Sequence, residues 1–374
     1  MGAGVVTIGT VLRPEVRYAR ADDGVAIAYS VVGGGPVTIA VVSPLISQLE
    51  LAWEEPALEH FWSRFAACAR VVLFDRRGAG LSDRLPAGER LDLAALALDI
   101  GAVLDACDAG QAALLGVTFG CPVAIGFAAS HPDRVQALVL AGGFAKLTRL
   151  GEFDFAANPG LVDEWASSTA RAWGSGAVFG ARAPSLGDSA RYREWAARME
   201  RHTCSPGSVE ALCRCAAAID VRPLLADLRM PVLVIHRRGD HAVPASDGRY
   251  LAEHIPGAEY AELPGEDHTL FAGDQRAVHK TVIGFLDRAV AGGAMSTALR
   301  RAARKDAAGT GWEALTPSER EVAALIASGL TNSQVASRLR VSPHTVDGRL
   351  RRVFAKLGVN TRVELTAEYA RVTG

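Results

Sequence analysis

Short apolar runs alternate with amphipathic stretches along the first part of the chain. Five such runs precede residue 146, at residues 25–32, 37–42, 71–74, 112–116 and 138–141. Between two of them, residues 91–107 repeat leucine and isoleucine at helical spacing. Short buried strands that alternate with helices predict a mostly parallel sheet with helices on both faces, which is an α/β fold.

The alternation stops at about residues 146–228, a helix-prone stretch in which we find no clear strand pattern. It resumes with apolar runs and helical patterns in turn, at residues 231–235, 246–254, 259–263 and 275–290. A helical insert between two strands predicts a cap that covers the sheet. Residues 1–290 are therefore predicted to form one domain with a helical cap.

The remaining chain is predicted to form a linker and a small all-α domain. Residues 291–311 are rich in Ala, Gly and Arg and lack a core pattern, which is typical of a linker. Residues 312–374 contain start and stop signals for four short helices: capping boxes at Thr316, Thr331 and Thr361, Ser342-Pro343 before the third helix, and stops at Gly329 and Gly358. The tight turn at 339–341 predicts a helix-turn-helix arrangement.

The third of these helices has two unlike faces. One is an apolar stripe of Val346, Leu350, Val353, Phe354 and Leu357. The other carries Thr345, Arg349, Arg352 and Lys356, which combine hydrogen-bonding and cationic groups. We predict that Thr345 and Arg349 contact DNA base edges and that Arg352 and Lys356 contact phosphates. The alternative is an ordinary solvated helix face.

Charge is distributed unevenly between the two predicted domains. The whole chain has a net charge of -1, but residues 291–374 hold 13 Lys and Arg against 7 Asp and Glu. Residues 1–290 hold 27 basic against 34 acidic residues. A basic C-terminal part on an acidic body indicates two modules with different partners.

Composition excludes several classes of protein. An apolar fraction of 49% with 22% charged residues is typical of a globular protein. We find no apolar stretch of about 18 residues and no signal-peptide pattern, and so expect no membrane span and a cytoplasmic location. The six cysteines are scattered, which favours reduced thiols, and they lack metal-site spacing. We expect no metal and no cofactor.

Residues 315–365, LTPSEREVAALIASGLTNSQVASRLRVSPHTVDGRLRRVFAKLGVNTRVEL, resemble the DNA-binding domain of LuxR-type transcriptional regulators. The similarity extends over 315–371. It implies a homodimer on a palindromic DNA site, with contacts from Thr331, Asn332, Ser333, His344, Thr345, Arg349, Arg352 and Lys356. One departure is Gly348-Arg349, where many members have a larger residue followed by His.

A candidate catalytic constellation lies in the first domain. Gly116-Val117-Thr118-Phe119-Gly120 has the spacing of the G-x-S-x-G nucleophile elbow, with Thr118 in place of Ser. Asp240 and His268 each follow a predicted strand, so nucleophile, acid and His occur in the order of an α/β-hydrolase. The alternative for each residue taken alone is a surface Asp or a structural His.

Residues 15–290 resemble the α/β-hydrolase family, whose segment after the fourth strand is similar to Phe74–Asp83. The resemblance implies that Thr118, Asp240 and His268 form a triad. It also places the first oxyanion-hole loop at Ser43-Pro44-Leu45-Ile46, which lacks the common His-Gly. We therefore expect Leu45 and Phe119 to provide the oxyanion or ligand-binding backbone donors.

Our functional prediction depends on Thr118, which stands where the elbow motif has Ser. An elbow residue adopts positive φ, which is strained for a β-branched residue, and the extra methyl crowds the hydroxyl. We predict a transcriptional regulator whose pocket binds a ligand with little or no hydrolysis. Alternatives are an esterase with a Thr nucleophile fused to a DNA-binding domain, and an interaction scaffold with a vestigial pocket. We expect cap residues to make the ligand small and mostly apolar: Trp165, Trp173, Val178, Phe179 and Trp195.

Overall fold

The computed structural model describes residues 5–8, 11–84, 91–308, 312, 315–339, 341–359 and 361–373. Side chains of residues 5–8, 11–13, 303–308, 317, 344, 355, 372 and 373 are outside this description. The chain divides into two compact units, one up to Ala298 and one from Leu299. Each unit is described by itself.

An eight-stranded sheet forms the centre of the first unit. The strands run β12-β11-β8-β7-β5-β6-β4-β3 across the sheet, and the six from β12 to β6 are parallel. β4 pairs antiparallel with β6 and with β3 at the edge. Their bounds are β3 Arg17–Arg20, β4 Ala26–Gly33, β5 Thr38–Val42, β6 Arg70–Phe74, β7 Ala112–Val117, β8 Val135–Ala141, β11 Val232–Arg237 and β12 Glu259–Leu263. This confirms the predicted mostly parallel sheet, to which the structure adds β3.

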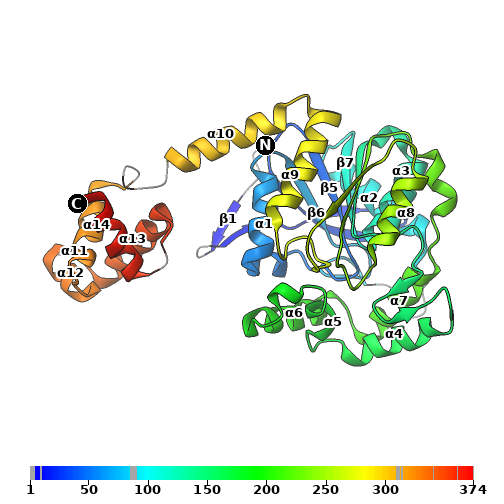
Figure 1. Ribbon diagram of the computed structural model, residues 1–374, viewed down its shortest axis with the longest axis horizontal. Coiled ribbons are helices and arrows are strands. Elements are labelled where there is room, and N and C mark those ends of the chain that lie inside the picture. The colour runs from blue at the N-terminus through cyan, green and yellow to red at the C-terminus, as the bar shows by residue number, and fades with distance from the viewer. Residues whose placement is uncertain are drawn as a thin grey trace. The chain divides into compact units, whose positions relative to one another are not determined.

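Helices cover both faces of this sheet (Figure 1). α1 (Pro56–Ala66) and α9 (Gln275–Leu286) pack together on one face. α2 (Leu93–Ala106), α3 (Gly120–Ser130) and α8 (Ala245–His254) contact strands on the other face. Short 3-10 helices η1 (Leu51–Glu54) and η2 (Pro132–Arg134) lie in the connections, and β1 (Val5–Ile8) and β2 (Val11–Pro14) form a separate antiparallel hairpin.

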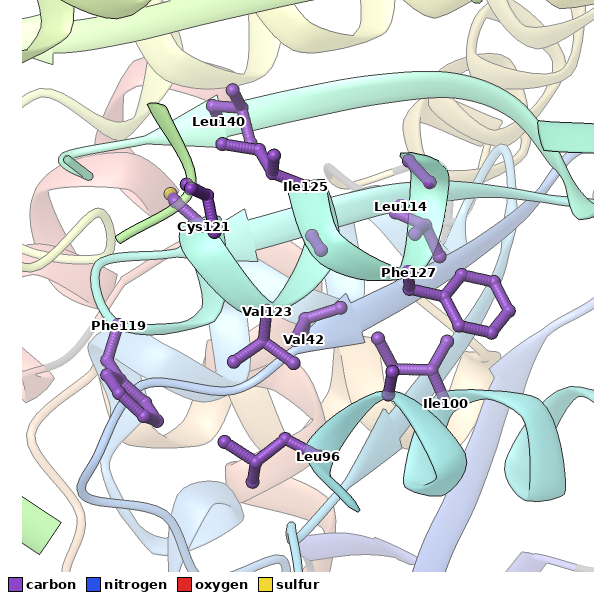
Figure 2. Close-up of a cluster of buried hydrophobic side chains, with 14 of the residues drawn as sticks. Val42, Leu96, Ile100, Leu114, Phe119, Cys121, Val123, Ile125, Phe127 and Leu140 are labelled. Carbon is purple, nitrogen blue, oxygen red and sulfur yellow. The ribbon is translucent and has the colours of Figure 1, made fainter. Parts of the chain in front are cut away.

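The core of this unit is built around α3. This helix is apolar on all sides, so it is buried between the sheet and α2 (Figure 2). Val123 and Phe127 lie on its α2 side near Leu96 and Ile100, whereas Ile125 lies near Leu140 of β8. Burial on both sides fixes the N-terminal end of α3, where the predicted elbow lies.

The predicted cap at about 146–228 is helical apart from one small hairpin. It contains β9 (Arg149–Leu150), β10 (Phe153–Asp154), α4 (Leu161–Ala172), α5 (Ala177–Gly180), η3 (Pro184–Leu186), α6 (Ala190–Thr203), α7 (Pro206–Ala218) and η4 (Arg222–Asp227). The hairpin was not expected from the sequence, because strands of two residues are too short to show alternation. α4 packs on α7, and α5 packs on α6 (Figure 1).

The predicted linker begins in a tightly bound helical junction. α9 continues into a π-helical turn, η5 (Asp287–Ala291), and after two glycines with positive φ the helix α10 (Ala294–Ala308) begins. The buried Asp287 carboxylate accepts hydrogen bonds from the backbone N–H groups of Met295 and Ser296, at 3.0 and 3.2 Å. The first turn of α10 is thus anchored to the end of α9.

The second unit contains the four short helices that the capping signals predicted. They are α11 (Pro317–Ala327), α12 (Asn332–Leu339), α13 (Pro343–Leu357) and α14 (Arg362–Thr373). The capping box at Thr316 is formed in full, and Ser342 caps α13. Gly329 and Gly358 have positive φ at the predicted helix ends. The small core contains the stripe residues Val346, Leu350 and Val353.

Candidate functional site

The turn between β7 and α3 places Thr118 where an elbow nucleophile would lie. Thr118 has a φ of 54°, and among the described residues Asp108 is the other non-glycine position with positive φ. The flanking glycines are needed because a Cβ at Gly120 would lie 1.9 Å from the Val42 carbonyl oxygen, and one at Gly116 would lie 2.9 Å from Cys121. The predicted strained turn is therefore present, with a β-branched residue at its tip.

Three predicted residues from distant parts of the chain meet here. Thr118 Oγ1 lies 3.0 Å from His268 Nε2, and His268 Nδ1 lies 2.7 Å from Asp240 Oδ2. Each residue follows a parallel strand at its carboxyl end, and these ends share one edge of the sheet. The methyl of Thr118 therefore leaves the hydrogen bond to His268 intact. What it can still obstruct is the approach of a carbonyl carbon to Oγ1.

Asp240 is held by more partners than the sequence indicated. Its Oδ1 accepts hydrogen bonds from the backbone N–H groups of Ala242 and Val243, at 2.9 and 3.1 Å. A second histidine, His236, lies with Nε2 3.5 Å from Asp240 Oδ2. Burial opposes ionisation of Asp240, but His268 and His236 more than offset it, so its pKa lies below the ordinary value. The site thus holds an ionised carboxylate behind His268.

A cavity of about 140 Å³ opens beside Thr118 and His268. Most of its lining is apolar and includes Trp62, Phe74, Phe179 and Phe271. Leu58, Phe61 and Trp62 come from α1, not from the cap, and the sequence analysis did not find them. The helical spacing of these residues on α1 could equally place them in an ordinary core. The cavity suits a small, mostly apolar molecule with a polar group near Thr118.

The cap is attached directly to the loop that carries His268. The carbonyl of Arg182 accepts hydrogen bonds from the backbone N–H groups of His268 and Thr269, at 2.9 and 3.1 Å. The buried Glu200 carboxylate accepts from the N–H groups of Gly174, Gly176 and Phe179, at 2.7 to 2.9 Å. Together these bonds fix Phe179 at the cavity and join the position of the cap to that of His268.

The predicted ligand-binding role of the cap aromatics is wrong for most of them. Of the five residues, Phe179 lines the cavity. Trp195 packs behind Phe179 with its ring 5.4 Å away and donates to the Leu51 carbonyl. Trp165 is part of the core, Trp173 donates to the Cys204 carbonyl, and Val178 is partly buried but is not among the residues that line the cavity. Their helices need these large side chains to pack against the rest of the domain.

The two predicted oxyanion residues come from different segments, because Leu45 follows β5 and Phe119 lies in the turn between β7 and α3. Leu45 lines the cavity, and its carbonyl accepts a hydrogen bond of 2.5 Å from Arg76. Phe119 caps α3, but its side chain is buried in the core (Figure 2). The prediction concerns the backbone N–H groups of these residues and stays a prediction.

Cys121, three residues after Thr118, belongs to the core. It is fully buried, its thiol lies 3.2 Å from the Gly116 carbonyl, and burial raises its pKa to about 12. All six cysteines are buried free thiols. Within the described residues, no group of three or more His, Cys, Asp and Glu is placed to hold a metal ion.

The second unit presents the polar face predicted for α13. Val346 and Val353 are fully buried, and Phe354 and Leu357 are partly buried against the same core. Thr345 and Arg349 are partly exposed on the other side. Thr345 Oγ1 lies 2.8 Å from Ser342 Oγ, which caps the helix. The side chain of His344 lies outside the described residues.

The residues around α12 that were predicted to contact DNA differ in exposure and in their hydrogen bonds within the protein. Thr331 and Ser333 are exposed. Asn332 instead connects helices, because its amide donates to Asp347 and its carbonyl oxygen accepts from Arg362. Direct contact of Asn332 with DNA stays a prediction, but its observed partners give it a structural role.

Arg352 and Lys356 are both paired with one carboxylate inside the protein. Arg352 Nε lies 3.2 Å and Lys356 Nζ 2.7 Å from the Glu319 carboxylate. Burial opposes ionisation of Glu319, yet hydrogen bonds from Lys356 and Thr316 lower its pKa to about 2. Lys356 is 28% exposed and Arg352 is 63% exposed. Arg352 therefore has the freer side chain for a phosphate, and Lys356 mainly links α13 to α11.

Comparison with known families agrees with this geometry. Residues 53–274, more than half of the chain, match the family described as alpha/beta hydrolase fold. The chain belongs to this family. Residues 313–368 match the family described as bacterial regulatory proteins, luxR family. The chain thus joins an alpha/beta hydrolase domain to a LuxR-family helix-turn-helix domain.

Individual relatives resemble one domain or the other. The LuxR-family domain is 52% identical over 61 residues to "Putative HTH-type transcriptional regulator Rv0890c" of Mycobacterium tuberculosis H37Rv; the match covers 16% of this chain and 7% of that protein. The hydrolase domain is 27% identical over 268 residues to "Putative carbamate hydrolase RutD" of Caulobacter sp. K31, covering 69% of this chain and 95% of the relative. The esterase RhEst1 from Rhodococcus sp. ECU1013 matches with 28% identity and a TM-score of 0.59, over 73% of this chain and 99% of the esterase.

No helix in the described part of the chain has the length and apolar character needed to cross a bilayer.

Proposed function

We propose that this protein is a transcriptional regulator whose alpha/beta hydrolase domain binds a small, mostly apolar carbonyl compound and thereby controls DNA binding. The observation that carries the proposal is the cavity beside Thr118 and His268 in a chain that also has a LuxR-family DNA-binding domain. A built cavity with a polar group at one end is the usual form of a small-molecule site. It also argues against a vestigial pocket.

Thr118 favours binding over turnover. The Thr118–His268–Asp240 hydrogen bonds hold a polar group that can bind a ligand carbonyl or hydroxyl. A reacting carbonyl carbon must come within about 3–3.5 Å of Oγ1, and the Thr118 methyl occupies part of that space. The same groups can hold a ground-state oxygen without that approach.

The hydrogen bonds of the hydrolase domain provide a route for control. A ligand that displaces Phe179 moves the segment whose Arg182 carbonyl holds His268 and Thr269. That loop leads along the chain into α9, and Asp287 at the end of α9 holds the first turn of α10. α10 leads to the LuxR-family domain, so a shift in this junction changes how that domain is presented to DNA.

Binding and control are tested together with a ketone, which cannot be hydrolysed. The full chain is allowed to select DNA from a random pool, and its affinity for the selected DNA is measured by fluorescence anisotropy with and without 2-octanone. We expect the ketone to quench Trp62 and to change DNA affinity at least about fivefold, a typical allosteric coupling.

Two variants serve as controls. Ala52→Phe fills the cavity and should abolish both effects, whereas Leu98→Phe, at an exposed position on α2, should leave both unchanged. Quenching with unchanged DNA affinity would exclude control by the ligand, and absence of ketone binding would exclude the receptor itself.

A second candidate is an esterase that uses Thr118 as nucleophile. The intact 3.0 Å contact between Thr118 and His268 favours it, as does the similarity to an esterase over most of the domain. Wild-type release of p-nitrophenol from p-nitrophenyl butyrate, abolished by His268→Ala, would support this function.

We further propose a cytoplasmic homodimer that binds a palindromic site. One helix-turn-helix contacts too little DNA for tight specific binding, and two-fold dimers bind half-sites about one helical turn apart. Light scattering should give the mass of a dimer on DNA, and a monomer both free and bound would contradict this proposal.

A further inference from the structure

Buried polar atoms without partners gather at the cavity of the hydrolase domain. Ser47 Oγ, Asp75 Oδ1 and Thr269 Oγ1 each lack a hydrogen-bond partner among the described residues, and all three residues line the cavity. A buried polar atom without a partner has lost its hydration without compensation, so a group of such atoms in a native protein requires an explanation, such as a bound ligand. Ser43 lines the same cavity but differs from these residues, because its hydroxyl donates a hydrogen bond of 2.6 Å to the Phe74 carbonyl.

The Asp75 carboxylate is held so that one oxygen remains available. Its Oδ2 accepts hydrogen bonds from the backbone N–H groups of Leu49 and Leu81, at 3.2 and 2.9 Å, whereas Oδ1 has no hydrogen-bond partner and Asp75 lines the cavity. Ser47 is close enough to favour the ionised form of Asp75, yet neither Ser47 Oγ nor Asp75 Oδ1 makes a hydrogen bond of good distance and angle among the described residues. A hydroxyl group placed between these two atoms would satisfy both, by donating to Asp75 Oδ1 and accepting from the Ser47 hydroxyl.

The available oxygen lies away from the triad. Thr118 follows β7 and Asp75 follows β6, with β5 between them in the sheet. Neighbouring strands lie about 4.8 Å apart, so the two strand ends are separated by roughly 10 Å. The cavity lining reaches both, and the surface between them is largely apolar.

We infer that Asp75 and Ser47 form a second polar subsite that binds a hydroxyl group at the far end of the ligand. This inference rests on the proposed function, because it specifies the ligand of the same cavity. The ligand is then a carbonyl compound with a hydroxyl group several carbons from the carbonyl, which lies near Thr118 and His268.

The charges around Asp75 favour a neutral hydroxyl over an ammonium group. Burial raises the pKa of Asp75 to about 6, so at neutral pH the carboxylate is mainly ionised and acts as an acceptor. Arg76 is also buried beside it, and its positive charge favours the ionised form of Asp75. A cationic ligand would lose its hydration on entering this apolar cavity without a further anion to pair with, whereas a hydroxyl loses far less.

The inference is tested with ketones of matched length. Binding of 2-octanone, 8-hydroxyoctan-2-one and 8-aminooctan-2-one to the full chain is measured by calorimetry. We expect the hydroxyketone to bind at least about tenfold more tightly than 2-octanone, as a hydrogen bond to a charged group allows, and the aminoketone to bind less tightly than the hydroxyketone.

Substitutions assign the preference to the two residues. Asp75→Asn should remove most of the preference for the hydroxyketone, and Ser47→Ala should reduce it at least about threefold. Ser47→Ala keeps the test valid if Asp75→Asn does not fold, since Oδ2 of Asp75 also holds two backbone groups. Ser43→Ala is the matched control in the same lining and should leave the preference unchanged.

The outcomes separate this inference from the proposed function. If neither ketone binds, the proposed receptor fails. If both bind equally and Ser47→Ala changes nothing, the cavity is a receptor site whose far end holds only water, and the subsite is refuted. A preference for the aminoketone would refute the assignment to a hydroxyl.

Discussion

Thr118→Ser is the substitution that separates a receptor from an enzyme. It removes one methyl group and retains the hydroxyl that lies 3.0 Å from His268 Nε2. The positive φ of Thr118 is less strained for the unbranched Ser, so the turn itself should be preserved. We expect the variant to hydrolyse simple esters that wild type leaves almost intact.

The change in stability should be small compared with the change in rate. Complete burial of one methylene contributes about 0.8 kcal/mol, and half-buried Thr118 loses roughly half of that. Relief of left-handed strain, at most about 1–2 kcal/mol, acts in the opposite direction. The free energy of unfolding should therefore change by less than about 2 kcal/mol. General base catalysis by His268 contributes about 100-fold or more once the carbonyl can approach, which corresponds to about 2.7 kcal/mol in the barrier.

The assay is release of p-nitrophenol from p-nitrophenyl butyrate by the full chain. Thr118→Ser should raise kcat/KM at least about 100-fold over wild type, and the double variant with His268→Ala should return to background. Thr269→Ser is the matched control, because Thr269 lines the same cavity and removal of its methyl leaves the elbow unchanged. Wild-type turnover equal to that of Thr118→Ser, and lost with His268→Ala, would refute the receptor reasoning.

Four further predictions concern the LuxR-family domain. Lys356→Met should lower the melting temperature of the full chain in calorimetry, because the buried Glu319 carboxylate loses its ion pair with Lys356. An unchanged melting temperature would show that this ion pair does not stabilise the domain. The pKa of Glu319 is lowered to about 2, so the contribution of its carboxylate to the free energy of unfolding is present above the ordinary pKa. This contribution should be lost as the pH falls from about 4.5 toward 2. Acid-unfolding curves of wild type and Lys356→Met that coincide would contradict this. Gly348→Ala should stabilise α13 by up to about 1 kcal/mol, since an added Cβ meets no atom within 4 Å, and weaker DNA binding by this variant would instead indicate close approach of DNA to Gly348. Arg349→Ala should cost about 1–3 kcal/mol in DNA binding and relax sequence preference in a gel-shift series, and wild-type behaviour would contradict the groove assignment.

Local signals in the sequence predicted the architecture because they act over short distances along the chain. Alternating apolar runs predicted most strands of the parallel sheet, and the caps at Thr316 and Ser342 predicted helix starts that the structure contains. The elbow glycines and the order of Thr118, Asp240 and His268 were sufficient to expect that these residues meet. Parallel strands end at one edge of a sheet, so residues that follow them are brought together by topology alone.

The details of the site were decided by packing between distant segments. Cap tryptophans and the aromatic residues of α1 have similar patterns in the sequence, but only the fold determines that Trp62 faces the cavity and Trp165 faces the core. Likewise, the pairing of Lys356 with Glu319 depends on how α13 crosses α11.

The same reason applies to the buried polar groups of the hydrolase domain. The motif around Asp75 was visible in the sequence, but which of its oxygens is satisfied depends on the backbone of Leu49 and Leu81, which belong to two different loops. His236 beside Asp240 is a similar case. Periodicity determines which side of an element is buried, whereas the neighbours that meet a buried polar atom come from elsewhere in the chain and are known only from the tertiary structure.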